Sequence, residues 1–284
     1  MQIRDLEDRK NLWPELVRDL RYVTPPGMAG WMVRNIPGWA TIKYHAGVSS
    51  VIHGVARTAA AGKFDTSTFA TCCHDVLHIA EACGGMVEVE GVEHVRNNVP
   101  AVFVSNHMGS LETFVVAGLI LPFGDATFVL KESLMRYPVL RHLVAGINPV
   151  PVSRVNPRDD LKCVSKFGVE KLQAGISMII FPQATRSPVF DMHKFNTLGA
   201  KLAARAGVPL VPLAVKTDFL APGKIFKDFG IVDQRKSIRF RFGPPIRIGD
   251  QPKADHRIVM DFIASSLTEW GLSVIRSDES FTSD

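Results

Sequence analysis

The feature that most constrains the fold of this chain is an alternation of short apolar segments and longer amphipathic segments that begins near Met86. Apolar runs such as 101–105 and 177–182 have the length of buried strands, whereas 159–175 has the apolar spacing of a helix. The segment 237–248 alternates with a period of two, as a half-buried strand does. Strands separated by helices predict an α/β fold in which a mixed β-sheet is flanked by helices.

The part of the chain before Gly85 has a different pattern. It shows helical spacing of apolar residues without a clear strand, and prolines at positions 25, 26 and 37 interrupt it. We therefore expect three parts, which are an N-terminal helical region (1–85), an α/β domain (86–275) and a polar tail (276–284).

The composition indicates a folded chain with a modest positive charge. Of its 284 residues, 46% are hydrophobic and 21% are charged, which excludes global disorder. The net charge of +5 is compatible with an anionic partner, but it does not choose between nucleic acid, phospholipid and a phosphorylated metabolite.

The sequence also limits how the chain meets a membrane. Its longest apolar run, 114–123, is shorter than the ~18 residues that a spanning helix needs. The charged start of the chain does not resemble a signal peptide, and its four cysteines lie outside any CxxC pattern. These features predict a reducing, cytoplasmic location and at most peripheral or monotopic membrane contact.

The stretch SNHMGSLET (105–113) places His107 between an apolar strand and a helix, five residues before Glu112. On one ideal helix these residues would be roughly 140° apart. If His107 lies in the loop before the helix, it can fold back to Glu112 and act as a base whose ring the carboxylate orients. A capped polar turn, with Asn106 or Ser110 as N-cap and Glu112 in the first turn, fits the same letters.

Two further strands are predicted to end in arginines. In IIFPQATRS (179–187), Arg186 follows an apolar strand and lies beside two hydroxyl side chains, which suits a phosphate, although a solvated arginine in a tight turn also fits. In NPVPVSR (148–154), a strand ends in Arg154. The segment 207–215 contains Pro209 and Pro212, and these prolines favour an edge or wall strand.

Four blocks, NHMGSLE, PVSR, FPQATRS and VPLVPL, occur in this order over roughly 87–248. Together they resemble the glycerolipid acyltransferases, the family of 1-acylglycerol-3-phosphate acyltransferases, whose pattern is NHxxxxD, a strand ending in Arg, FPEGTRS and VPxxP. The order and spacing of four blocks are more specific than any single block. The resemblance implies a glycerolphosphate-acyltransferase-like sandwich.

The resemblance implies transfer of a fatty acyl group from acyl-CoA or acyl carrier protein to the hydroxyl of a lysophospholipid, such as lysophosphatidic acid, with no nucleic-acid partner. His107 matches the general base and Glu112 the carboxylate that orients it. Because a thioester is already activated, the reaction needs no metal or other cofactor. Positions that match substrate-binding residues of the family are Arg154, Gln183, Ala184, Thr185, Arg186 and Ser187.

Three positions depart from the family pattern. Glu112 stands where aspartate is usual, and its side chain is one methylene longer. Gln183 and Ala184 replace the usual glutamate and glycine, which removes one negative charge and easy access to positive φ. These departures bear on the acceptor more than on the reaction.

The segment from about 25 to 62 contains Trp31, Met32 and Trp39 among Arg34 and Lys43. Tryptophan beside basic residues suits a membrane interface, so we expect these helices to dip into an anionic leaflet on the cytoplasmic face. A helical subdomain packed on the α/β core fits the same sequence.

Other interpretations remain open. An acyl-thioester hydrolase would use the same base on water, although water needs no phosphate-binding arginines. A non-catalytic lipid-binding relative would fit Gln183 and Ala184, but such a protein needs no base. The stretch CCHDVLHIAEAC (72–83) has histidines one helical turn apart, but its cysteine spacing does not match a structural zinc site, so no metal is expected.

Overall fold

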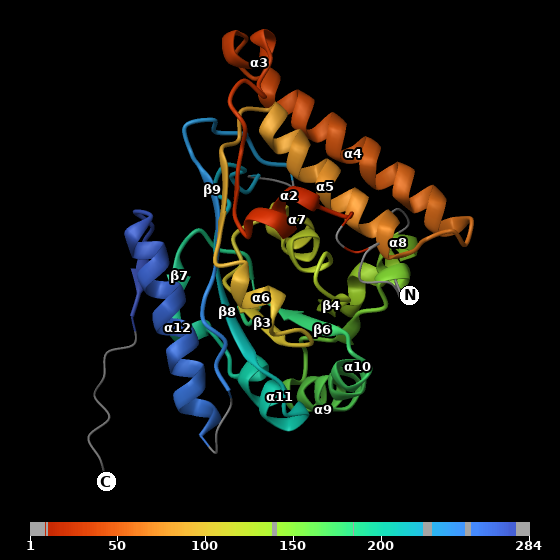
Figure 1. Ribbon diagram of the computed structural model, residues 1–284, viewed down its shortest axis with the longest axis vertical. Coiled ribbons are helices and arrows are strands. Elements are labelled where there is room, and N and C mark those ends of the chain that lie inside the picture. Colours follow the sequence, from red (N-terminus) through yellow and green to blue (C-terminus); the bar gives the residue numbers. More distant parts are fainter. Residues whose placement is uncertain are drawn as a thin grey trace.

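The computed structural model describes residue 9 and residues 11–137, 141–183, 185–223, 229–247 and 251–276. Ala184 and the polar tail beyond residue 276 lie outside the described residues. An eight-stranded sheet forms the centre, in the order β1-β2-β9-β8-β3-β6-β4-β5 (Figure 1). Its strands are β1 (Tyr22–Val23), β2 (Val87–Glu90), β3 (Val102–Ser105), β4 (Ala126–Lys131), β5 (Val150–Val152), β6 (Ser177–Ile180), β8 (Leu210–Lys216) and β9 (Ile238–Phe242).

The sheet is mixed, as the sequence predicted. β3 runs parallel to both of its neighbours, β6 and β8, and β4 is parallel to β5 and β6. β9 is antiparallel to β8 but parallel to β2, and β1 is antiparallel to β2. A separate parallel pair joins β7 (Phe190–Asp191) to β10 (Val274–Ile275).

Helices cover both faces of the sheet, and Figure 1 shows the two layers. They are α2 (Pro14–Asp19), α3 (Trp31–Asn35), α4 (Trp39–Ala60), α5 (Thr66–Ala82), α6 (Glu93–Arg96), α7 (Leu111–Ile120), α8 (Arg141–Ile147), α9 (Pro157–Cys163), α10 (Val169–Gln173), α11 (Leu198–Ala206) and α12 (Pro252–Glu269). Two short 3-10 helices are η1 (Glu132–Arg136) and η3 (Met192–Lys194), and η2 (Val164–Gly168) is a π-helical turn between α9 and α10.

Alternate residues of β3 divide the core into two clusters. Phe103 points into the cluster built with α5 and α7, whereas Val102 and Val104 point into the cluster built with α11 and α12. A close approach of α5 and α7 is possible because position 118 is glycine. A Cβ atom at Gly118 would lie 2.7 Å from the Cβ of Cys73. This packing fixes α7, whose first turn carries Glu112.

Three parts of the fold differ from the sequence-based expectations. β1 lies in the region that was expected to contain no strand, because two residues are too short to show periodicity. β8 was expected at an edge but lies between β3 and β9, with every residue buried. Its prolines are tolerated there because Pro209 precedes the strand and Pro212 precedes the first β8–β9 pair at Leu213. α12 was not anticipated. The boundary near residue 85 remains a prediction, although the first core cluster contains residues from both sides of it.

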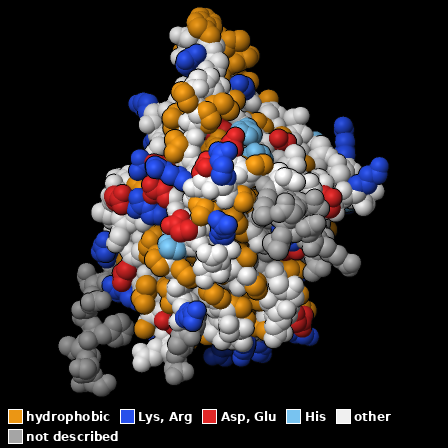
Figure 2. Space-filling model, in the orientation of Figure 1, with side chains coloured by type: hydrophobic (Ala, Val, Ile, Leu, Met, Phe, Trp, Pro, Cys, Tyr) orange, Lys and Arg blue, Asp and Glu red, His pale blue; other side chains and the backbone are white. Residues whose placement is uncertain are grey.

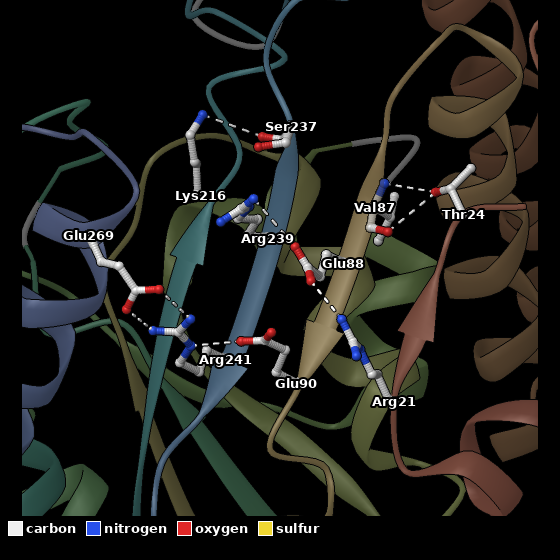
Figure 3. A network of polar contacts seen from close by, with 10 residues as sticks. All are labelled: Arg21, Thr24, Val87, Glu88, Glu90, Lys216, Ser237, Arg239, Arg241 and Glu269. Atoms are coloured by element: carbon white, nitrogen blue, oxygen red, sulfur yellow. Dashed lines mark hydrogen bonds and ion pairs between the residues drawn. The ribbon is translucent and has the colours of Figure 1, made fainter. Parts of the chain in front are cut away.

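The outer strands carry a network of ion pairs, shown in Figure 3. Glu88 lies 3.0 Å from Arg21 and 3.4 Å from Arg239, so it links β2 to β9 and to the residue before β1. Arg241 binds Glu90 and Glu269 at 2.8 and 2.6 Å, which fastens β9 to β2 and to α12. These charges lie on β2 and β9, the strands with the alternating pattern, and they account for the polar half of that alternation.

Within the described ranges, no helix combines the length and the apolar character that crossing a membrane requires.

Candidate active site

The site begins where β3 ends, in the middle of the sheet. Asn106 follows the strand directly, and its side-chain amide exchanges two hydrogen bonds with the backbone of Val215 on β8. The Nδ2 group donates to the Val215 carbonyl at 2.8 Å, and the Val215 N–H donates to Oδ1 at 2.9 Å. These two hydrogen bonds anchor the start of the 106–110 loop to a buried neighbouring strand. They therefore fix the backbone position from which His107 follows.

The loop brings His107 and Glu112 together. The Nδ1 atom of His107 lies 2.9 Å from Oε1 of Glu112. The same Oε1 accepts the backbone N–H groups of Met108 and Gly109 at 2.7 Å each, and Oε2 accepts the hydroxyl of Thr217 at 2.7 Å. The loop therefore folds back over the first turn of α7, as expected. Of the polar-turn alternative, only the position of Glu112 in the first turn of α7 agrees with the structure. The side chain of Ser110 makes no capping hydrogen bond, and that of Asn106 bonds to Val215 instead.

The Glu112 carboxylate is fully buried but stays ionised. Burial alone would raise its pKa, but the hydrogen bonds from His107, Gly109 and Thr217 outweigh burial, and the pKa lies below its usual value. A carboxylate accepts hydrogen bonds only, so the Nδ1 atom of His107 is the one that carries the proton. The Nε2 atom is then left to accept a proton.

Residues of the FPQATRS block also contact His107. The ring of Phe181 stacks on the His107 ring with a centroid distance of 4.4 Å. The side-chain oxygen of Gln183 accepts the His107 N–H at 2.7 Å, and the Ser187 N–H donates to the His107 carbonyl at 2.9 Å. Gln183, predicted to bind substrate, is 4% exposed and uses its oxygen on the backbone of the candidate base.

Arg154 and Arg186, which come from different strand ends, lie near each other. Burial lowers the pKa of Arg154, Asp160 raises it, and the positive charge of Arg186 lowers it further. Asp160 shapes the turn before α9, since its two oxygens accept the N–H groups of Ser153 and Arg154 at 2.8 Å each. Arg154 has φ of +59°, a strained value that Asp160 holds in place.

The remaining predicted binding residues are less uniform. Thr185 is exposed beside Arg186. The hydroxyl of Ser187 donates to the Val189 carbonyl at 2.8 Å and so closes its own turn. Sequence inspection missed Thr217 and Asp160, which lie 105 residues from Glu112 and six residues from Arg154, respectively. An aspartate in the first turn of a helix that follows a strand-ending arginine is the only local signal for Asp160.

A cavity of about 380 Å³ opens beside the base. Its walls come from α4, α5, α7, α8, β4 and η1, and most of its lining is apolar. The lining includes Ser110 and Thr113, which flank the His107–Glu112 pair in the chain, and Arg186, which precedes Ser187. The apolar residues Val48 and Ile52 of α4 and Leu143 of α8 line its body. Sequence inspection missed this cavity because its wall residues are far apart along the chain.

The described residues contain no group of three or more His, Cys, Asp or Glu side chains arranged to hold a metal ion. His78, in the stretch that resembles a metal site, instead lies 2.7 Å from the buried carboxylate of Glu81. The hydroxyls of Tyr22 and Thr24 donate to the same carboxylate at 2.7 Å. This cluster joins α5 to the segment around β1.

Comparison with known proteins defines the class. A family model described as Acyltransferase matches residues 86–216. A 1-acyl-sn-glycerol-3-phosphate acyltransferase of Pseudomonas aeruginosa is 31% identical over 184 residues, which cover 64% of this chain and 68% of that protein. The human 1-acyl-sn-glycerol-3-phosphate acyltransferase alpha is 28% identical over 146 residues, 50% of each chain. The chain is therefore an acyltransferase.

It belongs to the family of the 1-acyl-sn-glycerol-3-phosphate acyltransferases, as the four sequence blocks indicated. The chain spans 37% of the length of a chloroplast relative from Arabidopsis thaliana, to which it is 29% identical. The crystal structure of the 1-acyl-sn-glycerophosphate acyltransferase PlsC from Thermotoga maritima shares the fold, with a TM-score of 0.64 and 18% identity over 87% of this chain and 99% of that one. The mixed α/β sandwich predicted from the sequence is thus confirmed.

Proposed function

We propose that this chain transfers a fatty acyl group from an acyl thioester to the hydroxyl of a lysophospholipid, with 1-acylglycerol-3-phosphate as the acceptor and acyl-CoA or acyl carrier protein as the donor. The observation that carries the proposal is the buried, ionised Glu112 at 2.9 Å from His107, beside two arginines and an apolar cavity. The names of the relatives support the acceptor class.

In this mechanism His107 acts as the base. The acceptor oxygen attacks the thioester carbonyl carbon while its proton passes to Nε2 of His107, and the carbonyl electron pair moves onto oxygen. When that oxyanion re-forms the C=O bond, the C–S bond breaks and the thiolate takes the proton from His107. Glu112 stabilises the imidazolium that exists between the two steps. The products are a diacyl lipid and a free thiol.

Different groups around the base suit different parts of the two substrates. The paired arginines, Arg154 and Arg186, suit the phosphate of the acceptor. The apolar cavity suits the acyl chain, because its lining is mostly apolar and includes Ser110 and Thr113, which are close to His107 in the chain. Gln183 supports this geometry through the His107 backbone rather than through a charge, so the loss of the usual glutamate leaves the base in place.

The N-terminal helices suit contact with an anionic leaflet on the cytoplasmic face. Trp31 is 68% exposed and Ile42 is 61% exposed, with Met32 and Ile36 also on the surface. Figure 2 shows hydrophobic side chains and basic groups together at the tip formed by α3. Trp39, by contrast, packs partly against the core. We propose that α3 and the start of α4 rest in the headgroup layer.

The decisive experiment uses pure protein, a labelled acyl thioester and a panel of lysolipids. Acylated lysophosphatidic acid that disappears in His107→Ala supports the proposal. Free fatty acid without acylated lipid would instead identify a thioester hydrolase, and binding without turnover would identify a lipid-binding relative. Removal of the head-group phosphate from the acceptor should lower activity in the wild type far more than in Arg186→Ala.

The membrane contact is tested separately. Trp31→Ala combined with Ile42→Ala should reduce binding to anionic vesicles while leaving acylation of a detergent-dispersed acceptor unchanged. Undiminished vesicle binding would contradict this part of the proposal.

A further inference from the structure

The acyl transfer proposed above places a negative charge on the thioester carbonyl oxygen, and that charge needs hydrogen-bond donors. The N–H groups of the loop beside the base are already used. Those of Met108 and Gly109 bind Glu112, and that of His107 binds Gln183. The Ser187 N–H is bonded to the His107 carbonyl. A donor to the oxyanion must therefore come from outside the 107–109 loop.

Tyr44 of α4 is placed to supply one. It is 3% exposed and lines the same cavity as Ser110, Thr113 and Arg186. Its ring packs edge-on against Phe219, with a centroid distance of 6.3 Å. Phe219 lies two residues after Thr217, whose hydroxyl holds Glu112. Tyr44 thus lines the cavity and packs on the segment that holds Glu112.

The Tyr44 hydroxyl makes no hydrogen bond to any part of the chain that the structure describes. The hydroxyl is not one of the fully buried side-chain atoms that lack a partner, so it reaches the open space of the cavity that the residue lines. Tyr22 illustrates the contrast, since its hydroxyl donates to Glu81 at 2.7 Å. The unused donor of Tyr44, facing a substrate-sized cavity, points to a ligand atom as its partner.

The surroundings of Tyr44 keep its phenol protonated, as a hydrogen-bond donor must be. Burial raises the pKa of Tyr44, and the negative charge of Glu112 raises it further, so the phenol keeps its proton at any working pH. A phenol is also a more acidic donor than the alkyl hydroxyls of Ser110 and Thr113. It therefore strengthens its bond most when the carbonyl oxygen becomes charged.

We propose that Tyr44 is a catalytic residue that donates a hydrogen bond to the thioester carbonyl oxygen as acceptor attack converts that oxygen into an oxyanion. The inference rests on the proposed acyl transfer. It assigns a catalytic group to the N-terminal helical region, outside the residues that the family model matches. No proton leaves Tyr44 in the step, and the oxygen returns to a carbonyl when the C–S bond breaks.

The test is Tyr44→Phe, which removes one oxygen and keeps the ring that packs on Phe219. We expect kcat to fall by about 100-fold, the typical effect of losing one oxyanion donor. The KM for the acyl thioester should stay within about threefold. A thioether analogue of the donor, which lacks the carbonyl oxygen, should bind wild type and variant equally. Tyr22→Phe is the matched control, which removes a bonded phenol far from the cavity and should lower stability without changing kcat.

Two results would overturn the inference. One is a kcat of Tyr44→Phe within twofold of the wild type, and the other is weaker binding of the thioether analogue in proportion to the lost activity, which would mark Tyr44 as a packing residue. Measurement of His107→Ala in parallel distinguishes failure of the role of Tyr44 from failure of the proposed acyl-transfer mechanism. If His107→Ala is inactive and Tyr44→Phe is normal, only the role of Tyr44 fails. If His107→Ala keeps full activity, the proposed mechanism itself fails.

Discussion

Thr217 offers a quantitative test of how the site holds its buried charge. Its hydroxyl donates to Oε2 of Glu112 at 2.7 Å, and both residues are at most 1% exposed. Thr217→Val keeps the shape of the side chain and removes that donor. A hydrogen bond to a charged group contributes about 1.5–3 kcal/mol, and the oxygen left behind is shielded from water. We therefore expect the free energy of unfolding at pH 7 to fall by about 2 kcal/mol.

The same energy favours the ionised carboxylate, so its loss should shift the pKa of Glu112. Without that donor, the pKa of Glu112 should rise, because burial is then opposed by one hydrogen bond fewer. The pKa of Glu112 is depressed in the folded protein, so its contribution to stability is complete above the unfolded value and is lost as the pH falls through the folded value. The stability difference between wild type and variant should thus be largest near neutral pH and shrink in acid.

Urea unfolding of both proteins at pH 7 and at pH 4 measures this difference. Thr127→Val is the matched control, because the hydroxyl of Thr127 is equally buried and donates at 2.7 Å to a neutral acceptor, the Ile147 carbonyl. The control should cost about 1 kcal/mol at either pH. A Thr217→Val loss no larger than that of the control, and independent of pH, would refute the account of Glu112 given above.

Three further predictions concern other parts of the molecule. Gln183→Leu removes the acceptor of the His107 N–H and should lower kcat at least tenfold. Gln183→Glu keeps an oxygen at that place and should retain most activity. Steady-state acylation rates of both variants test this prediction. Val48→Trp narrows the cavity and should shift donor preference toward shorter acyl chains, measured by competition between thioesters of different length, while leaving the rate with the shortest donor within twofold. Burial and the neighbouring His78 lower the pKa of His74 to about 4. Between about pH 6.5 and 4 the folded protein therefore binds fewer protons than the unfolded chain, so its stability should decrease as the pH is lowered through that window. His74→Phe should flatten this loss of thermal stability between pH 7 and pH 5, and an unchanged slope would show that other groups cause it.

The sequence contained the parts of the fold and site that depend on neighbouring residues. The buried runs around β3 and β6 and the period of two in β9 are properties of short windows, so the sheet and its class were predictable. The contact between His107 and Glu112 was also predictable, because a loop of known length joins them.

What escaped prediction depends on contacts between distant segments. β8 lies in the middle of the sheet although its prolines favour an edge, because its ladder with β9 starts only at Leu213. Thr217 carries no local mark of its role, since its partner Glu112 is 105 residues away and only the fold brings the two together. The cavity escaped for the same reason, as its walls come from six separate helices and strands.

The length of α4 has a geometric consequence. Its 22 residues form a rod about 33 Å long, and Tyr44 lies five residues from its first residue, about 7 Å along the axis. The exposed tip formed by α3 immediately precedes this rod. If the tip rests among lipid headgroups, the rod sets the distance between that tip and Tyr44, and so limits how far from the headgroups the reaction takes place.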